Sequence, residues 1–203
     1  GIGSLLDSST PVRMTVPTGL TPVEAVAGNA HSLVRMQDGS VWACGNNRYG
    51  QLGDRTTVGR SSLTKVVFLS TAATPVPLTG AALPNIKSIG AGGDHRLAVS
   101  QDGKLYAWGL NVTGQLGLTT ASINSLILAK SASIDMVRTP AEVTTLTGKS
   151  IVSATGGRAH SLVSVKEVSA WKVFAFGANN AGQLGKASSP SPGLVSLAPV
   201  ETS

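Results

Sequence analysis

Residues 86–117 read IKSIGAGGDHRLAVSQDGKLYAWGLNVTGQLG, and two other parts of the chain repeat this segment. Residues 23–53 read VEAVAGNAHSLVRMQDGSVWACGNNRYGQLG, and residues 151–185 read IVSATGGRAHSLVSVKEVSAWKVFAFGANNAGQLG. The histidine and the last glycine are 22 residues apart in the first two copies (31 to 53, 95 to 117) and 25 apart in the third (160 to 185). Self-similarity of this kind is typical of repeat architectures. The sequence therefore predicts three copies of one structural unit.

Short apolar runs between turn residues indicate strands in each copy. One run precedes a glycine and has alanine between two apolar residues: Trp42-Ala43-Cys44, Tyr106-Ala107-Trp108 and Phe174-Ala175-Phe176. Because side chains alternate between the faces of a strand, both faces of this strand are apolar, as expected of a strand covered on both sides. Further strands are expected at 23–27, 86–91 and 151–155 and directly after each histidine. Four short strands per unit are typical of a propeller blade.

Turns are expected where glycine is concentrated. Asp38-Gly39 and Asp102-Gly103 separate apolar runs and predict type I′ hairpin turns with both residues at positive φ, and a longer loop at 166–171 replaces them in the third copy. The turn amides are expected to bond backbone groups around the glycine turns rather than a substrate. They are Gln51, Gln115 and Gln183 with Asn46, Asn111 and Asn179.

Thr-Pro pairs at 10–11, 74–75 and 139–140 mark a lead-in to each copy, and Ser191-Pro192 is an altered fourth. We therefore expect repeats at approximately 11–62, 75–126 and 140–191 within a single segment, 1–203. A propeller blade of this kind has roughly fifty residues, and the lead-ins lie further apart than that. The additional residues fall between the GQLG segment and the next lead-in, which predicts insertions near 54–73 and 118–138.

The order G-x-x-H, apolar strand, Asp-Gly, aromatic-Gly strand and N-x-x-G-Q-L-G resembles the repeat of the regulator of chromosome condensation family. The three matches cover almost the whole chain, with GQLG at 50–53, 114–117 and 182–185. The resemblance implies an all-β fold, an arc of about three four-stranded blades from a propeller that usually has seven. Three repeats cannot close such a ring, so we expect the remainder of the propeller to be missing from this chain.

Composition limits the other possibilities. The chain is 41% hydrophobic and 13% charged, with a net charge of +6 and a single cysteine, Cys44. An internal disulfide is therefore excluded, and Cys44 at a core position is expected to be inert. No apolar run is long enough for a transmembrane helix. We expect an intracellular protein, without a more specific compartment.

The matched residues of the three copies are expected to be structural. His31, His95 and His160 invite a metal-site interpretation, but equivalent positions in a repeat protein lie in different units, so hydrogen bonding within the fold is favoured. The same holds for the turn residues Gly50, Gln51, Gly53, Gly114, Gln115, Gly117, Gly182, Gln183 and Gly185. No phosphate-binding loop, Ser-His-Asp set or paired carboxylates can be assembled. We therefore predict no catalytic residues, no cofactor and no metal.

The two expected insertions carry the candidate partner contacts. These are Arg55, Arg60, Lys65 and Phe68 in the first and Leu126 and Lys130 in the second. Basic residues beside apolar ones are compatible with a contact surface for another chain. An extra strand or helical turn folded onto its own blade is the equally supported alternative.

The favoured function is a non-enzymatic protein-interaction scaffold within a larger assembly. The first alternative is a guanine-nucleotide exchange factor for a small GTPase, which the resemblance implies because the family's namesake acts on Ran. The second is nucleic-acid or chromatin binding, which the positive net charge favours and the lack of a dense basic run disfavours.

Overall fold

The computed structural model describes residues 1–69, 77–78, 84–118, 136–185 and 196–201, and in these residues twelve strands form three antiparallel four-stranded sheets. In each sheet the strands are adjacent in chain order. The first blade contains β1 (Pro22–Ala27), β2 (His31–Met36), β3 (Val41–Gly45) and β4 (Arg60–Lys65). The second contains β5 (Ile86–Ala91), β6 (His95–Ser100), β7 (Leu105–Leu110) and β8 (Met136–Glu142). A short 3-10 helix, η2 (Thr144–Leu146), leads to the third, with β9 (Ile151–Gly156), β10 (His160–Lys166), β11 (Trp171–Gly177) and β12 (Ser196–Glu201).

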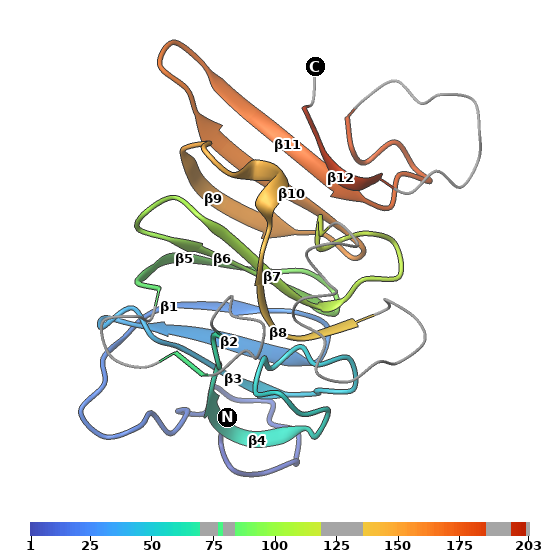
Figure 1. The fold of residues 1–203 in the computed structure, drawn as a ribbon. Coiled ribbons are helices and arrows are strands. Elements are labelled where there is room, and N and C mark those ends of the chain that lie inside the picture. The colour runs from blue at the N-terminus through green and yellow to red at the C-terminus, as the bar shows by residue number, and fades with distance from the viewer. Residues whose placement is uncertain (70–76, 79–83, 119–135, 186–195, 202–203) are drawn as a thin grey trace.

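The three sheets are stacked face to face in chain order, as neighbouring blades of a β-propeller are (Figure 1). The all-β arc of three four-stranded blades is thereby confirmed. The predicted equivalence of the alanine-centred strands is also confirmed, because β3, β7 and β11 are each the third strand of their sheet. Their central alanines pair in the same register, Ala43 with Leu33, Ala107 with Leu97 and Ala175 with Leu162.

The hairpin turns lie where they were predicted, but their type differs. Gly39 and Gly103 have φ of +79° and +81°, whereas Asp38 and Asp102 are absent from the residues with positive φ. The Gly39 N–H donates to the Met36 carbonyl, and the Met36 N–H donates to the Ser40 carbonyl. This is a type I turn followed by a left-handed glycine, so only one residue of the pair needs positive φ. The Asp38 carboxylate instead accepts hydrogen bonds from the backbone and hydroxyl of Ser40.

The expected insertion at 54–73 contains β4, the outer strand of the first blade. Likewise, β8 begins within the expected insertion at 118–138 and includes Thr139 and Pro140. That Thr-Pro pair therefore belongs to the last strand of the second blade rather than to a lead-in of the third. For residues 60–65, the extra-strand alternative is the one that the structure shows. The pairs at 74–75 and 191–192 lie outside the described residues.

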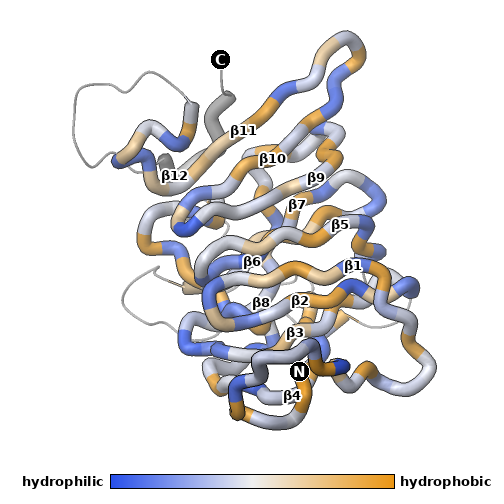
Figure 2. The backbone as a smooth tube through the Cα atoms, turned by 180° about the vertical axis from the view of Figure 1, so that it is seen from behind, coloured by the Kyte–Doolittle hydropathy of each residue, from blue (hydrophilic) through white to orange (hydrophobic). Residues whose placement is uncertain are grey.

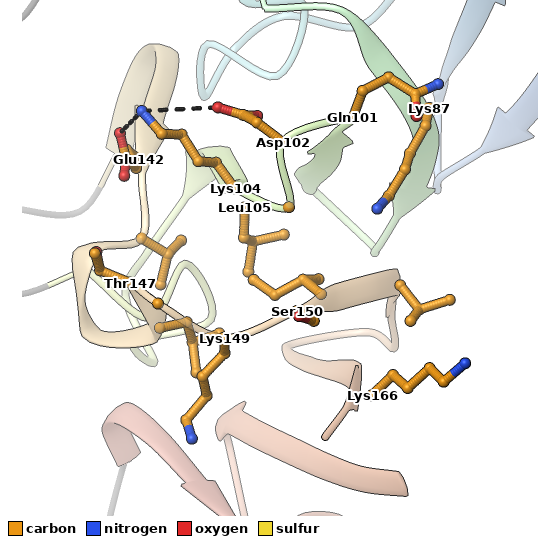
Figure 3. Close-up of a pocket in the computed structure, with 16 residues that line it drawn as sticks. Lys87, Gln101, Asp102, Lys104, Leu105, Glu142, Thr147, Lys149, Ser150 and Lys166 are labelled. Carbon is orange, nitrogen blue, oxygen red and sulfur yellow. Dashed lines mark ion pairs between the residues drawn. The ribbon is translucent and has the colours of Figure 1, made fainter. Parts of the chain in front are cut away.

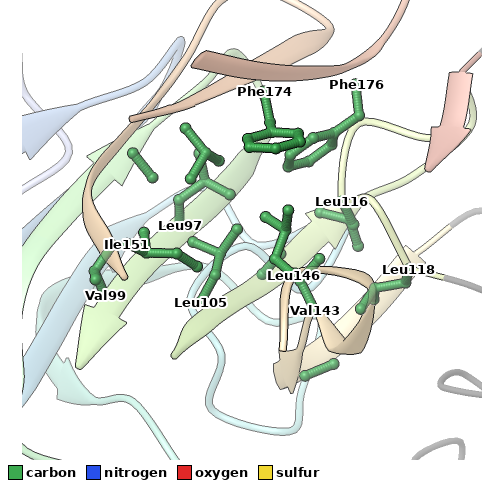
Figure 4. Close-up of a cluster of buried hydrophobic side chains, with 14 of the residues drawn as sticks. Leu97, Val99, Leu105, Leu116, Leu118, Val143, Leu146, Ile151, Phe174 and Phe176 are labelled. Carbon is green, nitrogen blue, oxygen red and sulfur yellow. The ribbon is translucent and has the colours of Figure 1, made fainter. Parts of the chain in front are cut away.

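The hydrophobic core lies between the blades. Hydrophobic residues recur along the strands of each blade (Figure 2). One cluster joins the second and third blades, where Phe174 and Phe176 of β11 lie against Leu97, Leu105 and Leu116 (Figure 4). The other cluster joins the first and second blades around Leu33, Leu52 and Trp108. Within the described ranges, no helix is long and apolar enough to span a bilayer.

Candidate functional site

The GQLG segments form the same pair of consecutive turns in each blade. The amide of the second glycine donates to the carbonyl of the first, from Gly53 to Gly50, from Gly117 to Gly114 and from Gly185 to Gly182. The six glycines have φ between +64° and +76°. The side-chain oxygens of Gln51, Gln115 and Gln183 accept backbone N–H groups inside these turns, as predicted.

The turn asparagines bond backbone N–H groups, but Asn46 is not the residue equivalent to Asn111 and Asn179. Asn111 and Asn179 accept the N–H groups of Leu116 and Leu184, and the matching acceptor for Leu52 in the first blade is Asn47. Asn46 instead accepts the N–H of Arg48 and is exposed. The first copy has two adjacent asparagines, Asn46 and Asn47. The spacing N-x-x-G-Q-L-G identifies Asn47 as the one equivalent to Asn111 and Asn179.

The turn glycines also fit against the next blade. A Cβ atom placed on Gly117 would lie 2.9 Å from ring carbons of Phe176, and one placed on Gly53 would lie 2.9 Å from the indole nitrogen of Trp108. The same indole nitrogen donates to the Gln51 carbonyl at 3.1 Å. Each of these two turns therefore covers the third strand of the following blade. The close contact requires a residue without a side chain at Gly53 and Gly117.

The matched histidines take different hydrogen-bonding roles. The Ser161 hydroxyl donates to the Gln115 carbonyl at 2.7 Å and lies 2.8 Å from His95 Nε2. Because the hydroxyl has one proton to give, His95 Nε2–H is the donor to it. Burial lowers the pKa of His95 to about 4, with a further lowering by His160, so the ring is neutral. His95 thereby links the second blade to the third.

The equivalent link between the first and second blades is absent. The serine position is occupied by Arg96, which is 0% exposed, and both ring nitrogens of His31 are buried without a hydrogen-bond partner. Arg96 Nη1 donates to the His95 carbonyl at 2.7 Å, but its Nε and Nη2 have no partner. Burial lowers the pKa of the Arg96 guanidinium to about 9. A buried cation without a counter-charge destabilises a fold.

We therefore expect Arg96→Met to raise the free energy of unfolding by about 1–2 kcal/mol, since an apolar side chain of similar volume removes the unpaired charge. The His95 carbonyl keeps a donor in this variant, because it also accepts the Gly92 N–H. Urea unfolding of the 203-residue chain measures the change, with exposed Arg13→Met as the control. A variant less stable than the wild type would show that the Arg96 bond to His95 outweighs the desolvation of the guanidinium.

An arginine loop, residues 54–60, projects from the first blade. One Asp54 carboxylate oxygen accepts hydrogen bonds from Asn47 Nδ2 and from the N–H and hydroxyl of Thr56. The other lies 3.1 Å from Arg60 Nη2. Burial raises the pKa of Asp54, but the bonds from Thr56, Arg60 and Asn47 outweigh it and hold the pKa below its usual range. A dense set of internal bonds thus holds the loop in one shape.

The arginine loop exposes a charged and an apolar side chain, those of Arg55 and Val58. Arg55 is exposed and has a φ of +71°, the one non-glycine residue with positive φ among the described residues. Its N–H donates to the Arg138 carbonyl of the second blade. Val58 is exposed as well. A non-glycine residue held in the left-handed region is strained, and such strain is concentrated at functional sites.

Of the other predicted partner contacts, two are exposed, one is buried and two lie outside the described residues. Arg60 and Lys65 are exposed at the two ends of β4. Phe68 differs from the expectation, because it is 4% exposed and packs edge-on against Tyr106, with ring centroids 5.4 Å apart. The apolar run at 66–69 therefore contributes to the core between the first two blades. Leu126 and Lys130 lie outside the described residues.

A cavity of about 470 Å³ between the second and third blades was not predicted from the sequence. Its lining includes Lys87, Lys104, Lys149 and Lys166, with the carboxylates of Asp102 and Glu142 (Figure 3). We call it the lysine cleft. Lys104 Nζ lies 3.5 Å from Glu142 and 4.0 Å from Asp102. Over the part of the chain that the structure describes, no group of three or more His, Cys, Asp or Glu side chains could hold a metal ion.

Comparison with known proteins gives a consistent result. The family model described as "Regulator of chromosome condensation (RCC1) repeat" matches residues 38–99 and 102–164, and a second model of the same description matches 23–51 and 86–115. Protein pim1 of Schizosaccharomyces pombe is 31% identical over 176 residues, which is 86% of this chain and 28% of that protein.

Two further matches extend this similarity. Guanine nucleotide exchange factor SRM1 of Saccharomyces cerevisiae is 32% identical over 108 residues, 53% of this chain and 22% of that protein. The crystal structure of human WBSCR16 matches with a TM-score of 0.66 and 26% identity over 94% of this chain and 40% of that chain. The chain thus spans less than half of each of these proteins.

Proposed function

Because the chain belongs to the regulator of chromosome condensation (RCC1) repeat family, we propose that it is a protein-interaction scaffold whose arginine loop contacts a partner protein. The observation that carries this proposal is Arg55, which is exposed and strained in a loop that Asp54 and Asn47 stabilise internally. A rigid loop loses little conformational entropy on binding. Arginine is also enriched among the residues that contribute most to protein interfaces.

Surrounding residues support a protein contact by the arginine loop. Val58 supplies an exposed apolar group beside Arg55, and Arg60 supplies a second cation at the base of the loop. An apolar group within a charged rim is the usual arrangement of a small protein-binding surface. Arg60 is held by Asp54, so we assign the direct contact to Arg55 and Val58.

The experiment replaces the loop side chains and leaves the strand intact. Deleting the expected insertion would remove β4, so Arg55→Ser/Val58→Ser is the variant, and exposed Arg13→Ser is the matched control for loss of one positive charge. Partner proteins are recovered on the immobilised chain from extract of the source cells and quantified by mass spectrometry. We expect recovery of at least one protein to fall about fivefold or more with the loop variant, a loss of about 1 kcal/mol in binding.

The control keeps wild-type recovery if the loop makes the contact. Equal recovery on the wild type and the loop variant, with both chains folded by circular dichroism, contradicts the proposal. Equal losses for the loop variant and the Arg13 variant would indicate a general charge effect instead.

Guanine-nucleotide exchange is a second candidate, because the yeast relative that matches 53% of this chain is named as an exchange factor. Exchange factors act by inserting groups beside a bound nucleotide, so no catalytic acid or base is needed. Release of fluorescent GDP from a Ran-type GTPase tests it. Exchange would be favoured over a passive scaffold if the chain accelerated GDP release and the Arg55→Ser/Val58→Ser variant accelerated it less.

A further inference from the structure

We propose that the lysine cleft binds an acidic peptide segment of a partner protein. The cleft and the arginine loop are separate, since the loop belongs to the first blade and the cleft lies between the second and third. Failure of the arginine-loop experiment and failure of this one are therefore independent.

Positive charge exceeds negative charge in the lysine cleft. Lys104 is held by Asp102 and Glu142. Lys149 pairs with Glu167 at 3.4 Å, but Glu167 is shared with Lys172 at 3.3 Å. Across the described residues, Lys87 and Lys166 have no carboxylate within ion-pair distance, and Lys166 lies 6.0 Å from the centre of the Trp171 ring. Two cations at the cleft are thus available to an anionic ligand.

The lysine cleft is large enough and firm enough for a peptide. Its volume of about 470 Å³ falls within the range of sites that hold small ligands or a few residues of a peptide. Leu105, Val143 and Leu146 line it and belong to the buried cluster between the blades. A floor made of core residues keeps its shape, so a ligand does not have to order the site first.

The distribution of charge favours carboxylates over a phosphate backbone. The paired carboxylates Asp102 and Glu142 lie on the Lys104 side of the lysine cleft (Figure 3). They would repel a polymer that carries a charge on every unit. In a peptide, acidic residues can alternate with neutral ones, and so avoid these two groups. Lysine is a mobile point charge, which suits carboxylates at irregular positions.

The test uses a fluorescein-labelled peptide of about ten residues that alternates Glu and Ser, with fluorescence anisotropy as the readout. We expect Lys87→Gln/Lys166→Gln to weaken binding about tenfold, which corresponds to the loss of two partly exposed ion pairs. The matched control, Arg13→Gln/Arg158→Gln, removes the same charge from exposed residues outside the lysine cleft. It should change the dissociation constant by less than about twofold.

A second variant keeps the test valid if the double variant does not fold. Glu142→Gln removes a carboxylate from the lysine cleft and leaves Lys104 with only the longer pair to Asp102, so it should tighten peptide binding by about threefold. Equal effects of the cleft and control variants, or no tightening with Glu142→Gln, would overturn the proposal. It would also be overturned if an oligothymidylate of similar length bound more tightly than the peptide and lost affinity with the same lysines, since that result would assign the site to nucleic acid.

Discussion

Replacing Gly117 with valine should lower the free energy of unfolding by about 4 kcal/mol, the largest effect that we expect from a single substitution. Gly117 has a φ of +64°, where a β-branched side chain is strained by about 1–3 kcal/mol. Its new Cβ would also lie 2.9 Å from the Phe176 ring, which is fully buried and cannot move without opening the core. Overpacking of this kind adds about 1–3 kcal/mol.

Two other variants separate the causes. Gly182 has a φ of +76°, but a Cβ atom added to it would meet no heavy atom within 4 Å, so Gly182→Val tests the strain alone and should lose about 1–2 kcal/mol. His95→Ala removes a hydrogen bond and should lose about 2 kcal/mol. Urea unfolding ranks the three variants. If Gly117→Val proved no worse than Gly182→Val, the contact with Phe176 would have no part in the stability of the blades.

Acidification from pH 7.5 to pH 5 should lower the free energy of unfolding by about 2 kcal/mol through His95. The pKa of His95 is about 4 in the folded chain and 6.5 when unfolded. Between these values the unfolded chain binds a proton that the folded chain does not, so stability falls as pH falls through 6.5. Burial also lowers the pKa of His160, which acts in the same direction.

The carboxylates do not obscure this effect. Asp38, Asp54 and Glu167 have lowered pKa values, so their contribution to stability is lost mainly below pH 5, outside the measured range. Urea unfolding at several pH values gives the slope, and His95→Gln should flatten it because the amide can still donate to Ser161 without titrating. The same slope in both chains would assign the pH dependence to other groups.

The inner three strands of each blade could be predicted from the sequence, and the outer one could not. Alternation around Ala43, Ala107 and Ala175 marks a strand covered on both faces, and Gly39 and Gly103 mark its hairpin. The outer strand β4 reads RSSLTK and is mostly exposed or half-buried, so it has no apolar pattern to distinguish it from a loop. For the same reason residues 54–73, which contain β4, are expected from the sequence to be an insertion.

The candidate sites also differ in how far the sequence could indicate them. Arg55 and Arg60 were singled out because both lie in one short basic segment. Lys87 and Lys166 lie in different repeats, and stacking of the second blade on the third brings both to one cavity. No local pattern could indicate that cavity. Phe68 was expected at a partner contact but is buried in the core. An apolar run next to basic residues has the same composition in either place, so composition alone could not distinguish them.

The contacts of the first two GQLG turns with the following blades give the arc a direction of growth during synthesis. Gly53 leaves the ribosome before Trp108, and Gly117 leaves it before Phe176, so the covering turn exists before the strand that it covers. When a new blade folds, the GQLG turn of the preceding blade is already in place. The new blade can therefore pack in register against that turn. Chains synthesised at about 5–20 residues per second give each blade a few seconds to settle before the next arrives. The order in which the blades are translated is thus also the order in which they can be placed.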